Sequence, residues 1–361
     1  MLRRVDGYLL WPAVALLAVG VLTLFSVTPI SGAQYFQNEF YFVIRQSVAL
    51  LIGGVLCLLA SRWDYRKLRK LAPFGLLLSV FLLLLTYLPG VGVMVGGASR
   101  WLGYGSLSFQ PSELAKFCLI LYVAAALTNK KNGLRSFWQD TLPILTVCGA
   151  VVLAILRQPD LGTSLVVLAT ILAMLFVGGS NFTDLLILGL LGFRALVYLV
   201  AHTPYQWRRW TAFLDPLGDR FGAGFNTIQS LIAVGSGGLF GVGMGNSRQK
   251  FAYLPQHYTD YIFAMICEER GFILAAAVVL LWAFLVLRGI RLASRVADPF
   301  GAFLALGFSL CLGIQSLVHI LVVLGWIPAT GITLPFISYG GSSLVTSLLM
   351  LGIILRISRE E

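Results

Sequence analysis

An acidic residue follows the longest polar interruption of the chain and directly precedes a long apolar run. The residue is Asp260, the last of the segment 254–260 (LPQHYTD), and the apolar run begins at Tyr261. A carboxylate that is held in water beside a lipid phase suits proton transfer on a polar group attached to a lipid. The simpler interpretation is an N-cap of the helix that begins at Tyr261, a role that Thr259 could fill instead.

Glu113 and Lys116 form a second candidate group, within the segment 108–116 (SFQPSELAK). Pro111 suits the first turn of a helix, and a spacing of three residues places the acid and the amine on one helix face. Charges inside a membrane are costly, so they indicate function by default. Two interpretations stay open: a structural ion pair that helps to bury the helix start, or a cavity wall in which Lys116 meets an anionic group and Glu113 orients it.

Asp160 lies in a short polar break, residues 157–160 (RQPD), between two apolar runs. The helix macrodipole favours an acid at a helix N-terminus, so Asp160 could be a simple N-cap or part of a site shared with Asp260. Other polar residues stand alone at or in apolar runs, and we expect the helix bundle to satisfy each of them. These are Arg194, His202 and His319.

Basic residues flank a glycine-rich segment, 235–245 (GSGGLFGVGMG). The segment is neither a Walker A motif nor a Rossmann fingerprint, because the GK[ST] ending and the strand–helix context are missing. Its glycines suit close helix packing or tight turns, although backbone N–H groups could also face a phosphate. Basic residues gathered on one face predict an anionic substrate, with a lipid-linked pyrophosphate as the obvious candidate. The residues are Arg208, Arg209, Arg220, Arg248 and Lys250.

The composition indicates an all-α integral membrane protein. Of the 361 residues, 58% are hydrophobic and 11% are charged, whereas soluble domains carry roughly 25% charged residues. The apolar runs are continuous, which excludes the short alternating segments of a transmembrane barrel. The five cysteines lie in apolar runs without CxxC spacing, so we interpret them as packing residues.

A helix needs about 20 apolar residues to cross the hydrocarbon core of a membrane. That length predicts about ten spans in a single polytopic domain, 1–361, at 8–28, 40–61, 71–89, 111–128, 141–156, 162–178, 185–202, 261–287, 299–324 and 343–357. Basic residues concentrate near both chain ends and in 62–70, 129–140 and 288–298. The positive-inside rule therefore places both termini in the cytoplasm. Most of the net charge of +11 then comes from the basic residues that the positive-inside rule explains. We therefore exclude nucleic-acid binding.

The opposite, extracytoplasmic face carries the ionisable residues that topology does not explain. Its longest connection, 203–260, far exceeds the about two to eight residues that usually join helices in bundles. The loop contains apolar stretches such as 228–234 (IQSLIAV). We therefore expect it to be partly ordered against the membrane face.

Several motifs, in order along nearly the whole chain, resemble the SEDS family (shape, elongation, division and sporulation), which includes RodA and FtsW. They are 108–116 (SFQPSELAK), 158–163 (QPDLGT), 222–226 (GAGFN) with 228–230 (IQS), and 334–343 (LPFISYGGSS). The resemblance implies a peptidoglycan glycosyltransferase that polymerises lipid II at the outer face of the bacterial cytoplasmic membrane. It also implies partners, namely a class B penicillin-binding transpeptidase and other proteins of the elongation or division complexes.

The resemblance also carries site residues onto this chain. The catalytic aspartate of the family falls on Asp260, and positions associated with its polar cavity fall on Arg100, Glu113, Lys116, Asp160, Arg209, Gln229, Ser230 and Lys250. The chain departs from the family motif where a glutamate and a histidine are expected, at Gln256 and Tyr258. Whether the adjacent His257 replaces the family histidine is left open.

Chain growth requires that a sugar hydroxyl attack an anomeric carbon while a lipid pyrophosphate leaves. We expect Asp260 to act as the general base, or to bind a divalent cation, Mg²⁺ or Mn²⁺, that activates the same hydroxyl. We expect no other cofactor. Lys116, Arg209 and either Arg100 or Lys250 would offset the charge of the pyrophosphate.

Two other functional classes compete with this interpretation. A flippase for a lipid-linked precursor is the main alternative, but the paired inverted halves typical of transporters are missing from the sequence. A scaffold without activity would leave the ionisable groups outside the membrane unexplained. The sequence also leaves elongation and division open, because 222–230 leans towards RodA whereas 243–250 and 332–335 lean towards FtsW.

Overall fold

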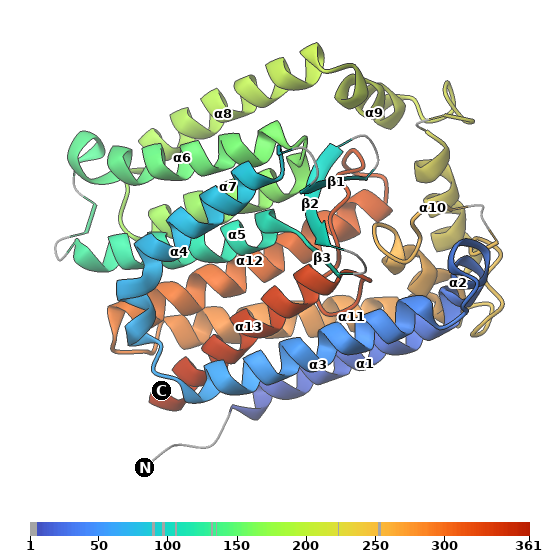
Figure 1. The fold of residues 1–361 in the computed structure, drawn as a ribbon, viewed down its shortest axis with the longest axis horizontal. Coiled ribbons are helices and arrows are strands. Elements are labelled where there is room, and N and C mark those ends of the chain that lie inside the picture. Colours follow the sequence, from blue (N-terminus) through green and yellow to red (C-terminus); the bar gives the residue numbers. More distant parts are fainter. Residues whose placement is uncertain are drawn as a thin grey trace.

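Long helices run side by side along one direction and make up most of the molecule (Figure 1). The computed structural model describes residues 6–88, 91–95, 98–104, 107–130, 133–134, 136–222, 224–251 and 254–361. The long helices are α1 (Gly7–Val27), α3 (Tyr41–Arg62), α4 (Arg66–Leu85), α5 (Pro111–Asn129), α6 (Leu142–Arg157), α7 (Leu161–Val177), α8 (Phe182–His202), α11 (Ile262–Ala293), α12 (Pro299–Val323) and α13 (Gly341–Ile357). The shorter ones are α2 (Pro29–Phe36), α9 (Pro204–Leu214) and α10 (Phe225–Ser236).

Every predicted membrane span has a helix at its position. Among the described residues, nine helical segments are long and apolar enough to cross a membrane, and α7 is a shorter apolar helix of 17 residues. The polar break at 157–160 is a tight turn, as predicted, because α6 ends at Arg157 and α7 begins at Leu161. The predicted boundaries were furthest off at the end of α11, which extends to Ala293 and not only to residue 287, and at the start of α4, which begins at Arg66 and not near residue 71.

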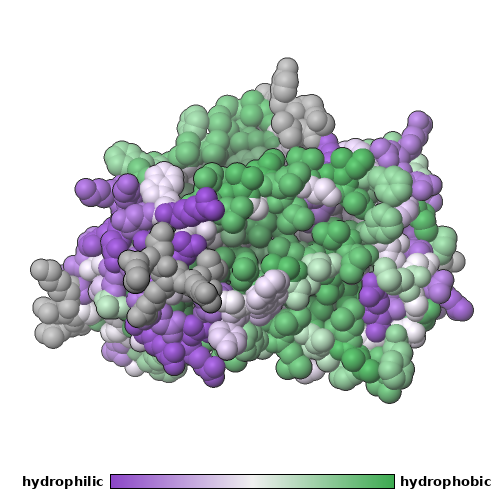
Figure 2. Space-filling model, turned by 90° about the horizontal axis from the view of Figure 1, so that it is seen from below, coloured by the Kyte–Doolittle hydropathy of each residue, from purple (hydrophilic) through white to green (hydrophobic). Residues whose placement is uncertain are grey.

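A wide apolar band separates two polar ends on the molecular surface (Figure 2). On α3 and α4, large apolar side chains such as Leu51, Phe74 and Leu77 are exposed. Soluble monomers rarely expose contiguous apolar patches larger than a few hundred Å². The band is therefore the lipid-facing surface of an integral membrane protein.

Both chain ends lie at the same end of the helix bundle (Figure 1). Near the start of the chain, Asp6 contacts Arg288 of α11 at 2.7 Å, and the same guanidinium pairs with the last residue, Glu361. A chain that crosses the membrane an even number of times has both of its ends on the same side, which agrees with this position of the two ends. We call this end, defined by Asp6, Arg288 and Glu361, the terminal end, and we call the opposite end, where α5, α7, α11 and α13 begin, the site end.

The connection between α4 and α5 contains a small sheet that the sequence interpretation missed. Its strands are β1 (Gly92–Val95), β2 (Ala98–Tyr104) and β3 (Leu107–Phe109), antiparallel in the order β1-β2-β3. Leu102 is paired with Gly92 on one side and with Phe109 on the other. Gly-Gly and Gly-Ser dipeptides separate these short segments in the sequence, which is a hairpin signal. No strand was predicted here, because this connection was considered only as a link between two spans.

The helix α11 is broken near its start, at Gly271, whose φ of 76° is not helical. The segment after α10 repairs the break with backbone hydrogen bonds. The N–H groups of Phe272 and Ile273 donate to the carbonyls of residues 238 and 239, at 2.9 and 3.2 Å. In return, the carbonyls of Glu268 and Glu269 accept from the N–H groups of residues 242 and 243, at 2.9 and 3.1 Å. The long loop is thus partly ordered, as predicted, and it holds the first turns of α11.

We predict that Gly271→Ala will strongly destabilise the protein. A Cβ atom at this position would lie 2.3 Å from the backbone nitrogen of Gly241, and the positive φ alone costs about 1–3 kcal/mol for a residue with a side chain. Thermal unfolding in detergent measures the effect. The matched control is Gly235→Ala in α10, where a Cβ meets open space and helix propensity favours alanine. Equal melting temperatures for the two variants would contradict the proposed constraint.

Candidate functional site

A tight turn presents Asp260 at the site end of the bundle. Gln256 adopts a left-handed conformation with φ of 54°, and its carbonyl accepts from the N–H groups of Thr259 and Asp260, both at 3.1 Å. The N-cap residue of α11 is Tyr261, one position later. The simple interpretation of Asp260 as the helix N-cap was therefore wrong, and its carboxylate is directed to other groups.

The loop between α12 and α13 fixes this turn from one side. Tyr339 donates its N–H to the carbonyl of Tyr258 at 2.9 Å, and the Ser338 hydroxyl donates to the carbonyl of Thr259 at 2.7 Å. Gln46 of α3 ties the same loop to the bundle by donating to the Ser338 carbonyl at 3.0 Å. The motif 334–343 thus serves to position the backbone that carries Asp260.

Charged groups from three other elements surround the Asp260 carboxylate. Burial, the largest influence, raises the pKa of Asp260 to about 6. Arg209 of α9, a hydrogen bond with Thr259, and Arg100 of β2 each lower that pKa, whereas the neighbouring carboxylate of Asp160 raises it. A carboxylate with a pKa near 6 is ionised at neutral pH, yet it is a much better proton acceptor than an ordinary aspartate.

Asp160 is held firmly by its own network. One carboxylate oxygen caps α7 by accepting from the Thr163 N–H at 3.1 Å, so the predicted N-cap role is confirmed. The other oxygen accepts from Gln110 and Ser112, both at 3.2 Å. Asp160 therefore joins the starts of α5 and α7 and contributes a fixed negative charge beside Asp260.

The two arginines near Asp260 also connect the walls of the site. Arg100 donates to the carbonyls of Gln158 and Pro159, at 2.9 and 2.5 Å, and so holds the sheet against the turn between α6 and α7. Arg209 donates to the carbonyl of Ala329 at 3.0 Å. A guanidinium has five N–H groups, so the two contacts of Arg100 leave donors that can face a substrate.

Glu113 and Lys116 form the predicted ion pair, with 2.8 Å between the carboxylate and the amine. Both side chains are buried, and Lys116 also donates to Gln315 of α12 at 2.6 Å. Gln315 in turn donates to the Thr333 carbonyl at 3.0 Å. Gly331 belongs to the same loop as Thr333 and lies close to the site, because a Cβ atom at Gly331 would be 3.7 Å from the Asp260 carboxylate. Through Gln315, the Glu113–Lys116 pair therefore supports the loop that borders Asp260.

The starts of four helices meet at this site. The N–H of Gln110, at the start of α5, donates to the Ser342 hydroxyl of α13 at 3.1 Å, and Gln110 also bonds to Asp160 of α7. Asp260 directly precedes the fourth helix, α11. Each helix N-terminus carries a partial positive charge of roughly half an elementary charge. The site is therefore electropositive beyond its two arginines and suits an anionic ligand.

Two of the residues carried over from the family, Ser230 and Lys250, make their contacts in other places, and Gln229 lies next to Ser230 on α10. Gln229 is half-buried on α10, and the Ser230 hydroxyl donates to the Val323 carbonyl at 2.8 Å, which joins α10 to α12. The Lys250 amine contacts the Gly245 carbonyl and lies beside Glu269. The structure therefore links Lys250 to the repaired break of α11.

Tyr258, at the family's histidine position, and the adjacent His257 both contact the structure around the turn. His257 is buried, with its ring nitrogens 2.9 Å from the Leu254 carbonyl and 3.1 Å from the Val27 carbonyl. Burial lowers the pKa of His257, and the contact with Val27 anchors the turn to the end of α1. Tyr258 packs against Phe42 and Tyr339, with ring centroids 4.5 and 5.8 Å apart. Both side chains thus make contacts that hold the turn in place.

The acids of the site do not form a protein cage for a divalent cation. Within the described ranges, no group of three or more His, Cys, Asp or Glu residues could hold a metal ion. Asp160 already accepts hydrogen bonds on both oxygens, which leaves Asp260 as the carboxylate ligand. Mg²⁺ is often held by one or two carboxylates together with substrate phosphates. The residues present fit a cation only when the substrate supplies further oxygens.

Several supporting residues were missed in the sequence interpretation. Gln110, Ser112 and Gln158 lie within motifs of which only the charged members were predicted to belong to the site. Gln315 and His319 are spaced four residues apart on one apolar helix, a signal of a polar helix face. The prediction that the bundle satisfies His319 holds for only one ring nitrogen: Nδ1 lies 2.8 Å from the Ile332 carbonyl, whereas the buried Nε2 has no hydrogen-bond partner among the described residues.

The fold and the site define a polytopic membrane enzyme with a charged site at one end of its helix bundle. A sequence profile of FtsW, RodA and SpoVE, described as cell cycle proteins, matches residues 8–361. The chain belongs to this family.

Its relatives are similar over almost their whole length. A probable peptidoglycan glycosyltransferase FtsW from Geobacter sp. (strain M18) is 41% identical over 360 residues, which cover 99% of this chain and 98% of the relative. Stage V sporulation protein E from Bacillus subtilis (strain 168) is 42% identical over 344 residues, covering 95% and 94%.

Solved structures share the fold. A chain in a structure on the coordination of polymerization and crosslinking by a peptidoglycan synthase complex is similar with a TM-score of 0.80, at 36% identity and 98% coverage of both chains. The crystal structure of the rod shape determining protein RodA from Thermus thermophilus gives a TM-score of 0.73, at 32% identity, covering 98% of this chain and 97% of that chain.

We predict that single substitutions in the Glu113–Lys116 pair will be more damaging than removal of both charges. Glu113→Gln alone leaves the buried Lys116 ammonium without its counter-charge, which typically costs about 3–5 kcal/mol. The double variant Glu113→Gln/Lys116→Met removes both charges and should melt at a higher temperature than either single variant. Thermal unfolding in detergent tests this order. Single variants that melt like the original protein would show that the pair does not stabilise the bundle.

Proposed function

We propose that the protein is a peptidoglycan glycosyltransferase that polymerises lipid II, a disaccharide-peptide linked to undecaprenyl pyrophosphate. The observation that carries the proposal is the Asp260 carboxylate, which is exposed to the positive charge of Arg100 and Arg209 where four helix N-termini meet. A site that combines a base with positive charge matches a reaction in which a hydroxyl is deprotonated and a pyrophosphate departs. The relatives named as glycosyltransferases support the same activity.

In the proposed mechanism, Asp260 accepts the proton of the acceptor sugar hydroxyl. The hydroxyl oxygen forms the new bond to the anomeric carbon of the donor, and the bond from that carbon to the pyrophosphate oxygen breaks. The leaving pyrophosphate keeps the bonding electron pair and departs without protonation. The reaction therefore needs no second carboxylic acid, in contrast to a glycosidase.

Positive charge stabilises the departing pyrophosphate in this proposal. Arg100 and Arg209 both act electrostatically on Asp260, and the start of α5 and the start of α13 add backbone N–H groups. Lys116 contributes indirectly, because it is buried against Glu113 and Gln315 and holds the loop beside Asp260. A divalent cation would supply charge to the pyrophosphate if it arrived with the substrate.

We further propose an orientation with both termini in the cytoplasm of a bacterium and with the site end at the outer face of the inner membrane. The basic residues of the terminal end support it through the positive-inside rule. A class B penicillin-binding transpeptidase is the proposed partner, supported by the synthase complex in which a similar chain was solved. Other elongation or division proteins would complete the assembly.

The central test is Asp260→Asn with purified protein and lipid II in detergent. Loss of a general base typically lowers a rate about 10²–10⁴-fold, so almost no glycan polymer should form. The matched control is Asp215→Asn, an exposed acid of the same long loop, which should retain full activity. Polymer formed by Asp260→Asn at the original rate would exclude Asp260 as the base. A protein that forms no polymer in detergent but moves the lipid across vesicles would be the alternative, a flippase.

The pH dependence of polymerisation gives a second test. A base must be ionised, so kcat/KM should rise with pH through an acid limb near the Asp260 pKa of about 6. Arg209 lowers that pKa, so Arg209→Gln should move the limb to higher pH. Arg208→Gln, an exposed neighbour on α9, should leave the limb in place. A limb that stays unchanged in Arg209→Gln would argue against Asp260 as the titrating group.

A further inference from the structure

A cavity of about 470 Å³ lies between α1 and α11 at the terminal end, at the opposite end of α11 from Asp260. Three arginines line it together with aromatic and aliphatic side chains. The lining residues are Tyr8, Phe284, Leu287, Arg288, Arg291 and Arg295. The proposed glycosyltransferase reaction uses none of them.

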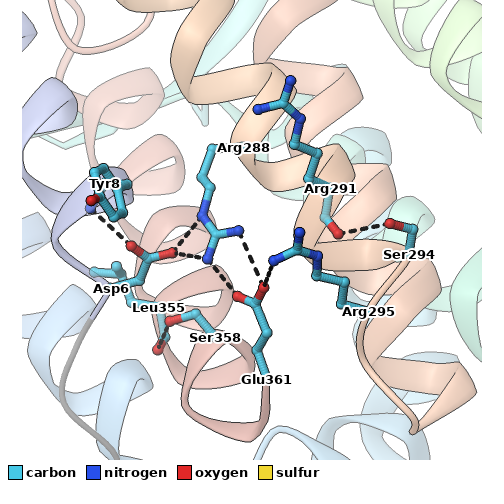
Figure 3. A network of polar contacts seen from close by, with 9 residues as sticks. All are labelled: Asp6, Tyr8, Arg288, Arg291, Ser294, Arg295, Leu355, Ser358 and Glu361. Atoms are coloured by element: carbon cyan, nitrogen blue, oxygen red, sulfur yellow. Dashed lines mark hydrogen bonds and ion pairs between the residues drawn. The ribbon is translucent and has the colours of Figure 1, made fainter.

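The three arginines differ in how their charge is compensated. Arg288 bonds to Asp6 at 2.8 Å and pairs with Glu361, and Arg295 contacts Glu361 at 2.9 Å. The Arg291 guanidinium points away from both carboxylates (Figure 3), and within the described part of the chain it has no acidic partner. Its positive charge helps to offset the partial negative charge at the carboxyl end of α11. Its planar guanidinium also lies at the cavity with N–H groups that can bind a phosphate.

The apolar residues place the cavity at the edge of the membrane. Tyr8 is 69% exposed and Leu287 is 53% exposed, so both belong to the lipid-facing surface. The rings of Tyr8 and Phe284 pack with their centroids 6.5 Å apart. Aromatic side chains are enriched at the depth of lipid headgroups. The cavity therefore combines positive charge with an apolar floor at the height where a phospholipid phosphate lies.

We propose that this cavity binds the headgroup of an anionic phospholipid. The phosphate contacts Arg291 and Arg295, and the acyl chains follow the apolar surface of Phe284 and Leu287. Basic pockets between transmembrane helices on the cytoplasmic side are a known type of anionic lipid site. A zwitterionic headgroup gains less here, because its positive choline would face the same arginines.

The test uses the full-length protein in detergent and native mass spectrometry, with phosphatidylglycerol, phosphatidylcholine and inorganic phosphate titrated separately. The protein should bind phosphatidylglycerol more tightly than phosphatidylcholine. Arg291→Gln should weaken phosphatidylglycerol binding about fivefold, which corresponds to about 1 kcal/mol per basic residue. The matched control is Arg62→Gln, an exposed arginine where α3 ends, which should bind like the original protein.

Three results would overturn the proposal. Equal binding of phosphatidylglycerol by Arg291→Gln and Arg62→Gln would show that Arg291 does not contribute to the site. Equal binding of the two lipids would remove the preference for negative charge, and equally tight binding of inorganic phosphate would indicate a site for a free anion. Arg291 is exposed, so its variant should melt like the control, and Arg291→Lys should recover most of the binding. Because no polymerisation is measured, the result is independent of the proposed enzymatic function.

Discussion

Polar groups enclosed in an apolar bundle must find their partners within the protein, and this constraint shapes the molecule. An unsatisfied backbone group in hydrocarbon costs several kcal/mol. The break in α11 is therefore closed by hydrogen bonds from the segment after α10, and the buried Lys116 is met by both Glu113 and Gln315. Loops, sheet and helix ends are drawn together at the site end because each satisfies polar groups of another.

The same low polarity gives the site its chemistry. Removal of water raises the pKa of Asp260, and the two arginines limit that rise so that the carboxylate is ionised at neutral pH. Both arginines are also held by backbone carbonyls, so their positions are set before a substrate arrives. Electrostatic stabilisation is most effective when its donors are fixed in this way.

The fold could be predicted where length and composition suffice, and the site only in part. Continuous apolar runs revealed the spans, and the i,i+3 spacing revealed the Glu113–Lys116 pair. The sheet at 92–109 was missed because its strands are short and rich in glycine. The break at Gly271 was missed because the charged residues Glu268, Glu269 and Arg270 just before it were included in one predicted span, and a positive φ leaves no mark in hydropathy. The contacts of Ser230 and Lys250 depend on how α10 and the following segment pack, which no local pattern encodes.

The break at Gly271 also changes what α11 needs to do as a membrane helix. The arginines at the terminal end lie at headgroup height, so only residues 272–287 of the part after the break face hydrocarbon, and at ~1.5 Å per residue they reach about 24 Å. This length is less than the ~30 Å thickness of the hydrocarbon core, so the crossing extends across the break at Gly271. The residues after α10 that close the break therefore reach into the edge of the membrane, where backbone groups need partners within the protein.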